Sequence, residues 1–125
     1  VCSVKLTRAS TILAAACPEG TGSSHYEAWM VGKSNYAEII ERFNAEGFRI
    51  GPHKAYQIAR DASRVTFMFY TDMDHDLARA LLLNPVPSFQ AAIDMALERL
   101  EPGDTIGVLP HAASTIPYLV KQGQK

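Results

Sequence analysis

Residues 11–17 form a continuous apolar run, Thr11-Ile12-Leu13-Ala14-Ala15-Ala16-Cys17, and this run decides the fold. Two further runs of the same kind follow, Val65-Thr66-Phe67-Met68-Phe69-Tyr70 and Thr105-Ile106-Gly107-Val108-Leu109. None of the three alternates apolar with polar residues, and continuous runs are typical of strands that are covered on both faces. The sequence therefore predicts three buried strands.

Apolar residues at helical spacing predict five helices outside these runs. The predicted helices cover residues 22–31, 36–43, 52–61, 74–81 and 88–100. Starting signals are present at Ser34 or Asn35, Pro52, Asp74 and Ser88, and Pro102-Gly103 ends the last helix. Tyr26, Trp29 and Met30 share a helical face, and we expect them in the core rather than around a cofactor.

Strands that alternate with helices pair in parallel and are joined by right-handed crossovers. A chain of 125 residues is long enough for one domain with its own core. We therefore expect residues 1–125 to form a single α/β domain. It should be a small, three-layer, Rossmann-like fold with a short, mostly parallel sheet, three or four strands wide, flanked by helices.

Composition argues against several classes of function. The chain carries 12 Lys and Arg against 13 Asp and Glu, whereas a nucleic-acid partner calls for a basic excess. No apolar run has the length of a membrane span, so no membrane partner is expected. Two cysteines are too few for a disulfide framework; we expect a cytoplasmic location and a buried thiol at Cys17. The start, Val1-Cys2-Ser3-Val4-Lys5, has neither Met nor a signal-peptide pattern and suggests a piece of a longer chain.

Ligands of open α/β sheets bind beyond the carboxyl ends of the strands, and this rule directs attention to three loops. The first reads Pro18-Glu19-Gly20-Thr21-Gly22-Ser23-Ser24-His25. It is rich in the backbone N–H and hydroxyl groups that an anion accepts, and Gly20 and Gly22 resemble the start of a dinucleotide fingerprint. His25 stands where that fingerprint has its third glycine, so a tight turn that needs glycine is the simpler interpretation.

The second loop is Gly51-Pro52-His53-Lys54, at the predicted start of a helix. Unpaired N–H groups and the helix dipole favour an anion there, and Lys54 adds a full positive charge. The sequence offers no better site for a carboxylate or a phosphate. The alternative is that Pro52 only starts the helix and that Lys54 points into water.

The third loop is Pro110-His111-Ala112-Ala113-Ser114-Thr115-Ile116-Pro117, after the last predicted strand. His111 can exchange a proton near neutral pH, and Ser114 and Thr115 add hydroxyls. Either hydroxyl residue equally suits the N-cap of a closing helical turn. The acidic stretch Asp72-Met73-Asp74-His75-Asp76 lacks the glycine and the distant Glu of a calcium loop, so helix capping explains it better.

The order and spacing of the three loops resemble the C-terminal domain of the lactate racemase family, from about residue 10 to residue 117. The matching stretches are Ala15-Ala16-Cys17-Pro18-Glu19-Gly20-Thr21-Gly22-Ser23, Gly51-Pro52-His53-Lys54-Ala55-Tyr56 and Leu109-Pro110-His111-Ala112-Ala113-Ser114-Thr115-Ile116-Pro117. This family comprises nickel-pincer-dependent 2-hydroxyacid racemases and uncharacterised relatives. It often has glycine where this chain has Pro52, Ala112 and Ala113, and these departures leave the substrate open.

The resemblance implies a two-domain enzyme with its active site in the cleft between the domains. The N-terminal catalytic domain would hold the nickel-pincer nucleotide and the acid/base histidines. The present domain alone would bind neither cofactor nor metal and would be inactive. It would close over a small anionic substrate, a 2-hydroxyacid, and Lys54 is the natural candidate to bind the carboxylate. The other candidate substrate-binding residues are Gly51, His53, Glu19, His111, Ser114 and Thr115.

A function of a different class stays open. The domain could be a stand-alone regulatory or ligand-binding module that holds an anionic small molecule on residues 20–24. The chain has no G-x-S-x-G elbow, P-loop or H-E-x-x-H motif, and no serine is plainly paired with a base. The sequence therefore assigns no catalytic residue.

Overall fold

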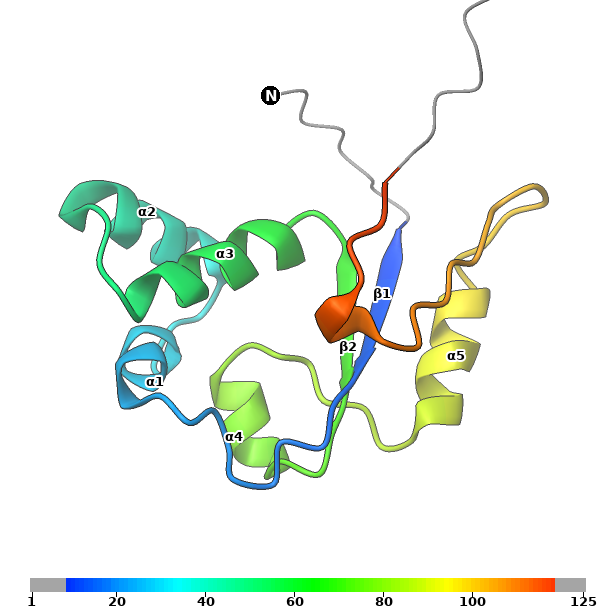
Figure 1. The fold of residues 1–125 in the computed structure, drawn as a ribbon, viewed down its shortest axis with the longest axis horizontal. Coiled ribbons are helices and arrows are strands. Elements are labelled where there is room, and N and C mark those ends of the chain that lie inside the picture. Colours follow the sequence, from blue (N-terminus) through cyan, green and yellow to red (C-terminus); the bar gives the residue numbers. More distant parts are fainter. Residues whose placement is uncertain (1–8, 119–125) are drawn as a thin grey trace, which may run out of the picture.

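Two parallel strands form the centre of the fold. The structure, a computed structural model, describes residues 9–118. Strand β1 (Ser10–Ala14) pairs with β2 (Thr66–Tyr70) in a register that sets Ser10 opposite Thr66 and Ala14 opposite Tyr70. The mixed α/β architecture and the parallel pairing confirm the predicted fold class (Figure 1).

Three helices connect β1 to β2. They are α1 (Ser24–Met30), α2 (Tyr36–Glu46) and α3 (Pro52–Ala62), and α3 packs against both α1 and α2. Parallel strands start at the same end of a sheet, so the chain must cross the sheet between them, and these helices make that crossover. In Figure 1 they lie together on one side of the strands.

Two more helices and one short turn follow β2. Helix α4 (His75–Ala80) comes directly after the strand, and α5 (Phe89–Leu97) packs against both strands. A single 3₁₀ turn, η1 (Ala112–Ser114), lies near the end of the described residues. None of the helices within residues 9–118 combines the length and the apolar character that a bilayer span requires.

Side-chain caps fix the starts of four helices. The side chains of Asn35, Asp74 and Ser88 accept from the backbone N–H groups of Glu38, Leu77 and Ala91, respectively, at 2.8–3.1 Å. Ser23 caps α1 in the same way, through the N–H of Tyr26 at 3.3 Å. These bonds satisfy N–H groups that the first turn leaves unpaired. The predicted caps at Asp74 and Ser88 are confirmed, and of the two alternatives for α2 the cap is Asn35.

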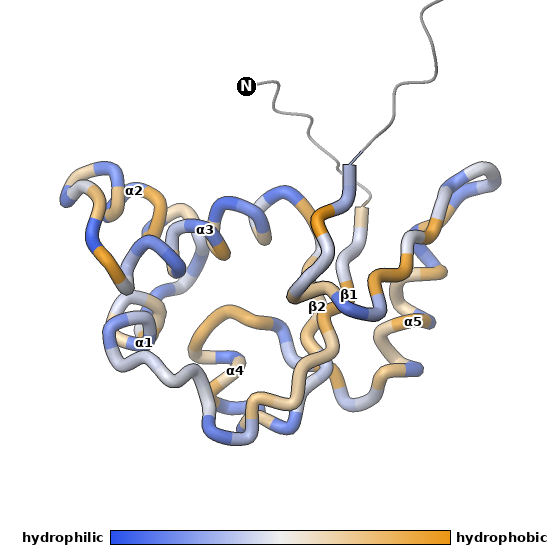
Figure 2. Tube along the Cα trace, in the orientation of Figure 1, coloured by the Kyte–Doolittle hydropathy of each residue, from blue (hydrophilic) through white to orange (hydrophobic). Residues whose placement is uncertain are grey.

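The two faces of the sheet pack against different helices, which makes three layers. Phe69 lies in the larger apolar cluster, which also contains Tyr26, Trp29, Met30, Ile39, Ala55, Ala59 and Ala78 from α1 to α4. The neighbouring residue Met68 faces the other way, into a small cluster with Val86 and Ala92 on the α5 side. Alternate side chains of a strand point to opposite faces, so β2 is covered on both. The strands and the segment after α4 are accordingly apolar in Figure 2.

The prediction of a third strand at residues 105–109 is wrong for this structure. These residues are exposed, have no regular secondary structure, and make no backbone hydrogen bond to another part of residues 9–118. The sheet is therefore two strands wide instead of three or four. A strand needs a neighbour for its N–H and C=O groups, and the apolar sequence alone does not supply one.

β1 is shorter than predicted because of the conformation of Cys17. Pairing continues for one residue beyond Ala14, where the N–H of Ala15 donates to the carbonyl of Tyr70 at 3.0 Å. Cys17 then adopts a φ of 46°, which an extended strand cannot contain. Its side chain is half-buried against the larger cluster, so the prediction of a buried thiol holds only in part.

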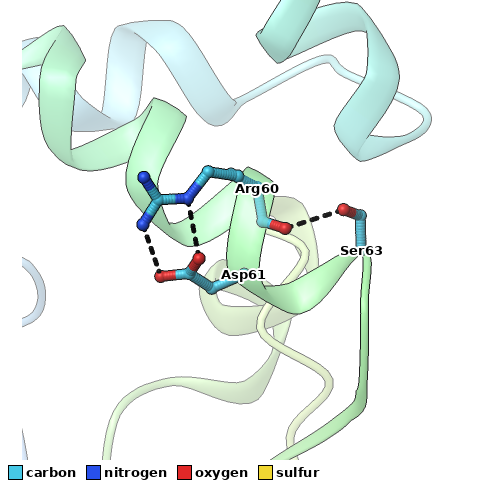
Figure 3. A network of polar contacts seen from close by, with 3 residues as sticks. All are labelled: Arg60, Asp61 and Ser63. Atoms are coloured by element: carbon cyan, nitrogen blue, oxygen red, sulfur yellow. Dashed lines mark hydrogen bonds and ion pairs between the residues drawn. The ribbon is translucent and has the colours of Figure 1, made fainter. Parts of the chain in front are cut away.

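The exposed end of α3 is held by local polar contacts. Arg60 forms a two-pronged ion pair with Asp61, and the Ser63 hydroxyl donates to the Arg60 carbonyl at 2.8 Å (Figure 3). The Arg60–Asp61 pair raises the pKa of the guanidinium. Pairs this exposed contribute little to stability, so the packing of α3 on α1 and α2, rather than this network, holds α3 in place.

Thr71 joins the carboxyl ends of the two strands. Its buried hydroxyl donates to the carbonyl of Ala16 at 2.9 Å and accepts from the N–H of Met73 at 3.1 Å. The N–H of Asp72 donates to the same Ala16 carbonyl at 3.0 Å. The side chain thus continues the pairing where the backbone ladder stops.

Replacing Thr71 by Val keeps the shape of the side chain and removes its hydroxyl. We expect a loss of about 1–3 kcal/mol in the free energy of unfolding, because the N–H of Met73 is left buried without a partner. Urea unfolding followed by circular dichroism measures this loss. Thr66→Val, at the half-buried start of β2, is the matched control and should cost less than half as much. Equal costs would show that Thr71 contributes only its volume.

Candidate functional site

The loop between β1 and α1 is organised by its own hydroxyls. Thr21 accepts from the N–H of Ser23 at 3.2 Å and donates to the Glu27 carboxylate, while Ser23 caps α1. Gly20 and Gly22 have φ values of 74° and 64°. The interpretation of this loop as a tight turn that needs glycine is therefore confirmed.

The carboxylate of Glu27 contacts the loop that a stand-alone binding module would use to hold an anion. Glu27 lies in the first turn of α1 and accepts the hydroxyl hydrogen of Thr21, in the middle of the predicted anion-binding loop. A bound phosphate or carboxylate there would meet a negative charge at close range, which is unfavourable. Glu19 lies exposed in the same loop. The loop is thus a poor anion site as it stands.

The start of α3 lies against the start of α1, and glycine makes this approach possible. A Cβ atom at Gly51 would lie 3.0 Å from the Cβ of His25, and the φ of Gly51 is 99°. Both the contact and the backbone angle exclude an ordinary side chain. The structure therefore brings together the first and second predicted loops, at His25 and Gly51.

The second loop does not follow a strand. Residues 51–54 connect α2 to α3, so the rule that selects loops at the carboxyl ends of strands does not apply to them. Their position beside α1 comes from the packing of α3 on α1 and α2 instead. This corrects the expectation that all three loops lie at one edge of the sheet.

The N–H groups at the start of α3 are already used. The N–H of Gly51 donates to Nδ1 of His53 at 3.0 Å, that of His53 to the carbonyl of Arg49 at 3.2 Å, and that of Lys54 to the carbonyl of Gly51 at 3.1 Å. Pro52 has no N–H. The predicted unpaired donors are thus absent at these positions, and an anion would depend on the Lys54 ammonium and the helix dipole.

Lys54 is exposed in the first turn of α3 and has no ion-pair partner within residues 9–118. Nearby, the ring of His53 lies 5.6 Å from that of Phe48, whose side chain is 72% exposed. The only ring nitrogen of His53 left to meet a ligand is Nε2, because Nδ1 accepts from Gly51. A neutral imidazole in this state carries its hydrogen on Nε2 and donates from it.

The third loop is exposed throughout. η1 begins after His111, and the hydroxyls of Ser114 and Thr115 both donate to the carbonyl of His111, at 3.2 and 2.8 Å. The prediction that one of them caps a helical turn is wrong, because they follow the turn and bond back to its start. No hydrogen bond or ion pair joins these residues to the other two loops in the part of the chain that the structure describes.

A hollow of about 280 Å³ opens at the carboxyl ends of β1 and β2. It is lined by Ala14, Ala15, Ala16, Tyr70, Thr71 and Asp72. The three alanines let a ligand approach the strand backbone, and Asp72 adds a carboxylate. Sequence reasoning pointed to this edge of the sheet but not to these residues, which carry no motif.

Two neighbouring tyrosines, Tyr26 and Tyr36, differ in the hydrogen-bond partners of their hydroxyls. The hydroxyl of Tyr36 donates to the carbonyl of Leu82, whereas that of Tyr26 is buried without a hydrogen-bond partner among the described residues. Burial, and then the nearby Tyr36, raise the pKa of Tyr26 to about 12, and burial also raises the pKa of Tyr36. Neither tyrosine is therefore suited to exchange protons near neutral pH.

The acidic stretch after β2 serves structural roles. Asp74 caps α4, and the Asp76 carboxylate pairs with Arg79 at 2.8 Å. Helix capping, the interpretation that the sequence favoured, is confirmed at Asp74. Within residues 9–118 no group of three His, Cys, Asp or Glu side chains is placed to hold a metal ion.

Comparisons of this chain with protein-family models, with curated proteins and with solved structures gave no match. The candidate site therefore stands on its own geometry.

Replacing Gly51 by Ala tests the approach of the two loops. The new Cβ would meet His25 in addition to the strain of a positive φ, so we expect a loss of more than about 2 kcal/mol in the free energy of unfolding. Gly103→Ala is the matched control, since Gly103 has a φ of 95° and nothing within 4 Å of its would-be Cβ. Chemical unfolding of both variants gives the difference. Equal losses would mean that the His25 contact carries no cost.

Replacing Tyr26 by Phe tests the unpartnered hydroxyl. At pH 7 we expect unchanged stability or a gain of up to about 1 kcal/mol, because no hydrogen bond is lost. The pKa of Tyr26 is higher in the folded state than its value of about 10 in the unfolded chain. This difference contributes stability that is fully present below pH 10 and is lost as the pH rises toward 12. The variant should therefore lose less stability over this range in thermal unfolding. Tyr36→Phe, which removes a hydrogen bond, should destabilise at pH 7; the reverse order of the two variants would contradict this assignment.

Proposed function

We propose that this domain forms one wall of the active site of a 2-hydroxyacid racemase or epimerase similar to the lactate racemase family. In this proposal the domain closes over the substrate and binds its carboxylate. The single observation that carries the proposal is the exposed, unpaired Lys54 in the first turn of α3.

Two physical effects make this position suitable for a carboxylate. The ammonium of Lys54 supplies a full positive charge, and the dipole of the eleven-residue helix α3 adds a partial positive charge at the same end. Because the first backbone N–H groups are already bonded, the charge of Lys54 is the principal attraction. The absence of an acidic partner among the described residues leaves the ammonium free to meet a substrate.

His53 can add a directed hydrogen bond. Its Nδ1 accepts from the N–H of Gly51, which fixes the ring orientation and leaves Nε2–H as a donor. A 2-hydroxyacid offers both a carboxylate and a hydroxyl oxygen within a few ångströms of each other. We assign the carboxylate to Lys54 and an oxygen of the same ligand to Nε2 of His53.

The proposal places the redox and proton-transfer chemistry on another domain. The nickel-pincer nucleotide of the family, when held by that other domain, would supply this chemistry. The described residues offer no cluster of three metal-binding side chains, so they do not fit the nickel itself. The role of this chain is limited to binding, orienting and enclosing the substrate, and we derive no catalytic step from it.

The test is Lys54→Met in the full-length enzyme. We expect the KM for a 2-hydroxyacid to rise about tenfold to a hundredfold with a smaller change in kcat, because a charge-assisted contact made in the ground state is lost. Lys33→Met, which removes a half-buried lysine that lies before α2, is the matched control and should leave KM unchanged.

Two results would contradict the proposal. An unchanged KM in Lys54→Met would remove Lys54 from substrate binding. Racemisation by the isolated domain would show that the chemistry does not need another domain. Calorimetry of the isolated domain against nucleotides and hydroxyacids separates the alternative, since micromolar affinity there would favour a stand-alone binding module.

A further inference from the structure

The outer edge of β1 is open. The carbonyl of Ala9 accepts from Thr66, and the N–H of Ala15 donates to Tyr70, so the odd-numbered residues of β1 direct their backbone groups toward β2. In a parallel strand the alternate residues direct theirs the other way. The N–H and C=O groups of Ser10, Ile12 and Ala14 therefore face outward, and no segment within residues 9–118 pairs with them.

The other edge of the sheet is already occupied. Residues 84–86 run parallel to the end of β2: the N–H of Phe69 donates to the carbonyl of Asn84, and the N–H of Val86 donates to the carbonyl of Phe69, both at 3.0 Å. The Asn84 side chain adds a bond to the carbonyl of Phe67 at 2.8 Å. An additional strand can thus extend the described sheet only beside β1.

Residues 105–109 have the composition of a strand and no neighbour. Ile106 and Val108 are 65% and 79% exposed, which is unfavourable for β-branched apolar side chains. Leu13 in β1 is also 39% exposed, so part of the apolar surface of the sheet is uncovered as well. An unpaired edge and an unpaired strand-like segment of the same length as β1 therefore occur in one chain.

The right-handedness of the crossovers determines at which edge of the sheet a third strand would lie, and this is the open edge of β1. Helices α1 to α3 cover one face of the sheet and α5 covers the other. Successive right-handed crossovers that use opposite faces move in opposite directions across a sheet. The first crossover leads from β1 to β2, so the one through α5 must lead back past β1 to its open side.

The connection also has the right length and starting point. Glu98 and Arg99, at the end of α5, line a small hollow together with Thr66, so the chain leaves α5 at the amino end of the strands. Residues 98–104 can span about 23 Å when extended, about twice the distance from a helix layer to a sheet. In Figure 1 the chain between α5 and η1 then passes in the same direction as β1.

We propose that the chain favours a second conformation, different from the one described, in which residues 105–109 leave their exposed position and bind the open edge of β1 as a third parallel strand. This pairing would bring His111 to the hollow at the carboxyl ends of β1 and β2. If the two five-residue strands pair end to end, Leu109 lies beside Ala14, and the loop that follows begins at the hollow lined by Ala14, Thr71 and Asp72. A histidine and a carboxylate then face one cavity. This inference does not rest on the proposed function, because it concerns backbone pairing alone.

Amide hydrogen exchange in the full chain, resolved by NMR, tests the pairing. If residues 105–109 occupy the edge, the N–H groups of Ile12 and Ala14 exchange at least about a hundredfold more slowly than in an unstructured chain. Val108→Pro removes a donor and blocks the strand, and should return both to fast exchange. Thr11 and Leu13, which bond to β2, should stay protected and report that the fold is intact.

Ala112→Pro is the matched control, because proline suits the first position of the turn η1 and leaves residues 105–109 unchanged. It should preserve the slow exchange of Ile12 and Ala14. Fast exchange of these two amides in the unaltered chain would overturn the proposal, and so would slow exchange that persists in Val108→Pro. Protection that disappears on dilution would also overturn it, since it would assign the edge to a second copy.

Discussion

The parallel pairing of β1 with β2 is the interaction on which the rest of the structure depends. Because both strands run in the same direction, the chain between them must return across the sheet, and α1 to α3 form this return. The alternation of Phe67, Met68 and Phe69 then assigns one face to these helices and the other to α5. Thr71 closes the pair at its carboxyl end, where the backbone ladder stops.

The geometry around Lys54 follows from two features that act at different levels. Gly51 permits α3 to begin beside His25, which fixes where the positive end of the helix lies. Local hydrogen bonds then consume the first backbone donors, so charge, and not a nest of N–H groups, is what the position offers an anion. This distinction matters chemically, because an isolated ammonium tolerates ligands of varied shape, whereas a nest selects a compact anion.

Local signals in the sequence predicted the local structure well. The side chains of Asp74 and Ser88 cap the helices that they were expected to start, and the apolar residues Tyr26, Trp29 and Met30 are buried as expected. Each of these outcomes depends on residues within one turn. The sheet was harder to predict, because residues 105–109 form a continuous apolar run as β2 does, and the local sequence does not reveal whether a distant segment pairs with such a run. Tertiary packing likewise produces the approach of Gly51 to His25 and the hollow at the strand ends. No sequence motif predicts either feature.

Because the two apolar clusters differ in size, the two sides of the sheet differ in local stability. The cluster beneath α1 to α4 joins four helices to the sheet, whereas the α5 side rests on Met68, Val86 and Ala92 and leaves Phe89, Met95 and Leu97 45–48% exposed. A helix with so little buried area detaches at a lower free energy than the whole domain unfolds. Local opening of α5 thus provides proteases with their first point of attack, while the larger cluster and the helices around it stay folded.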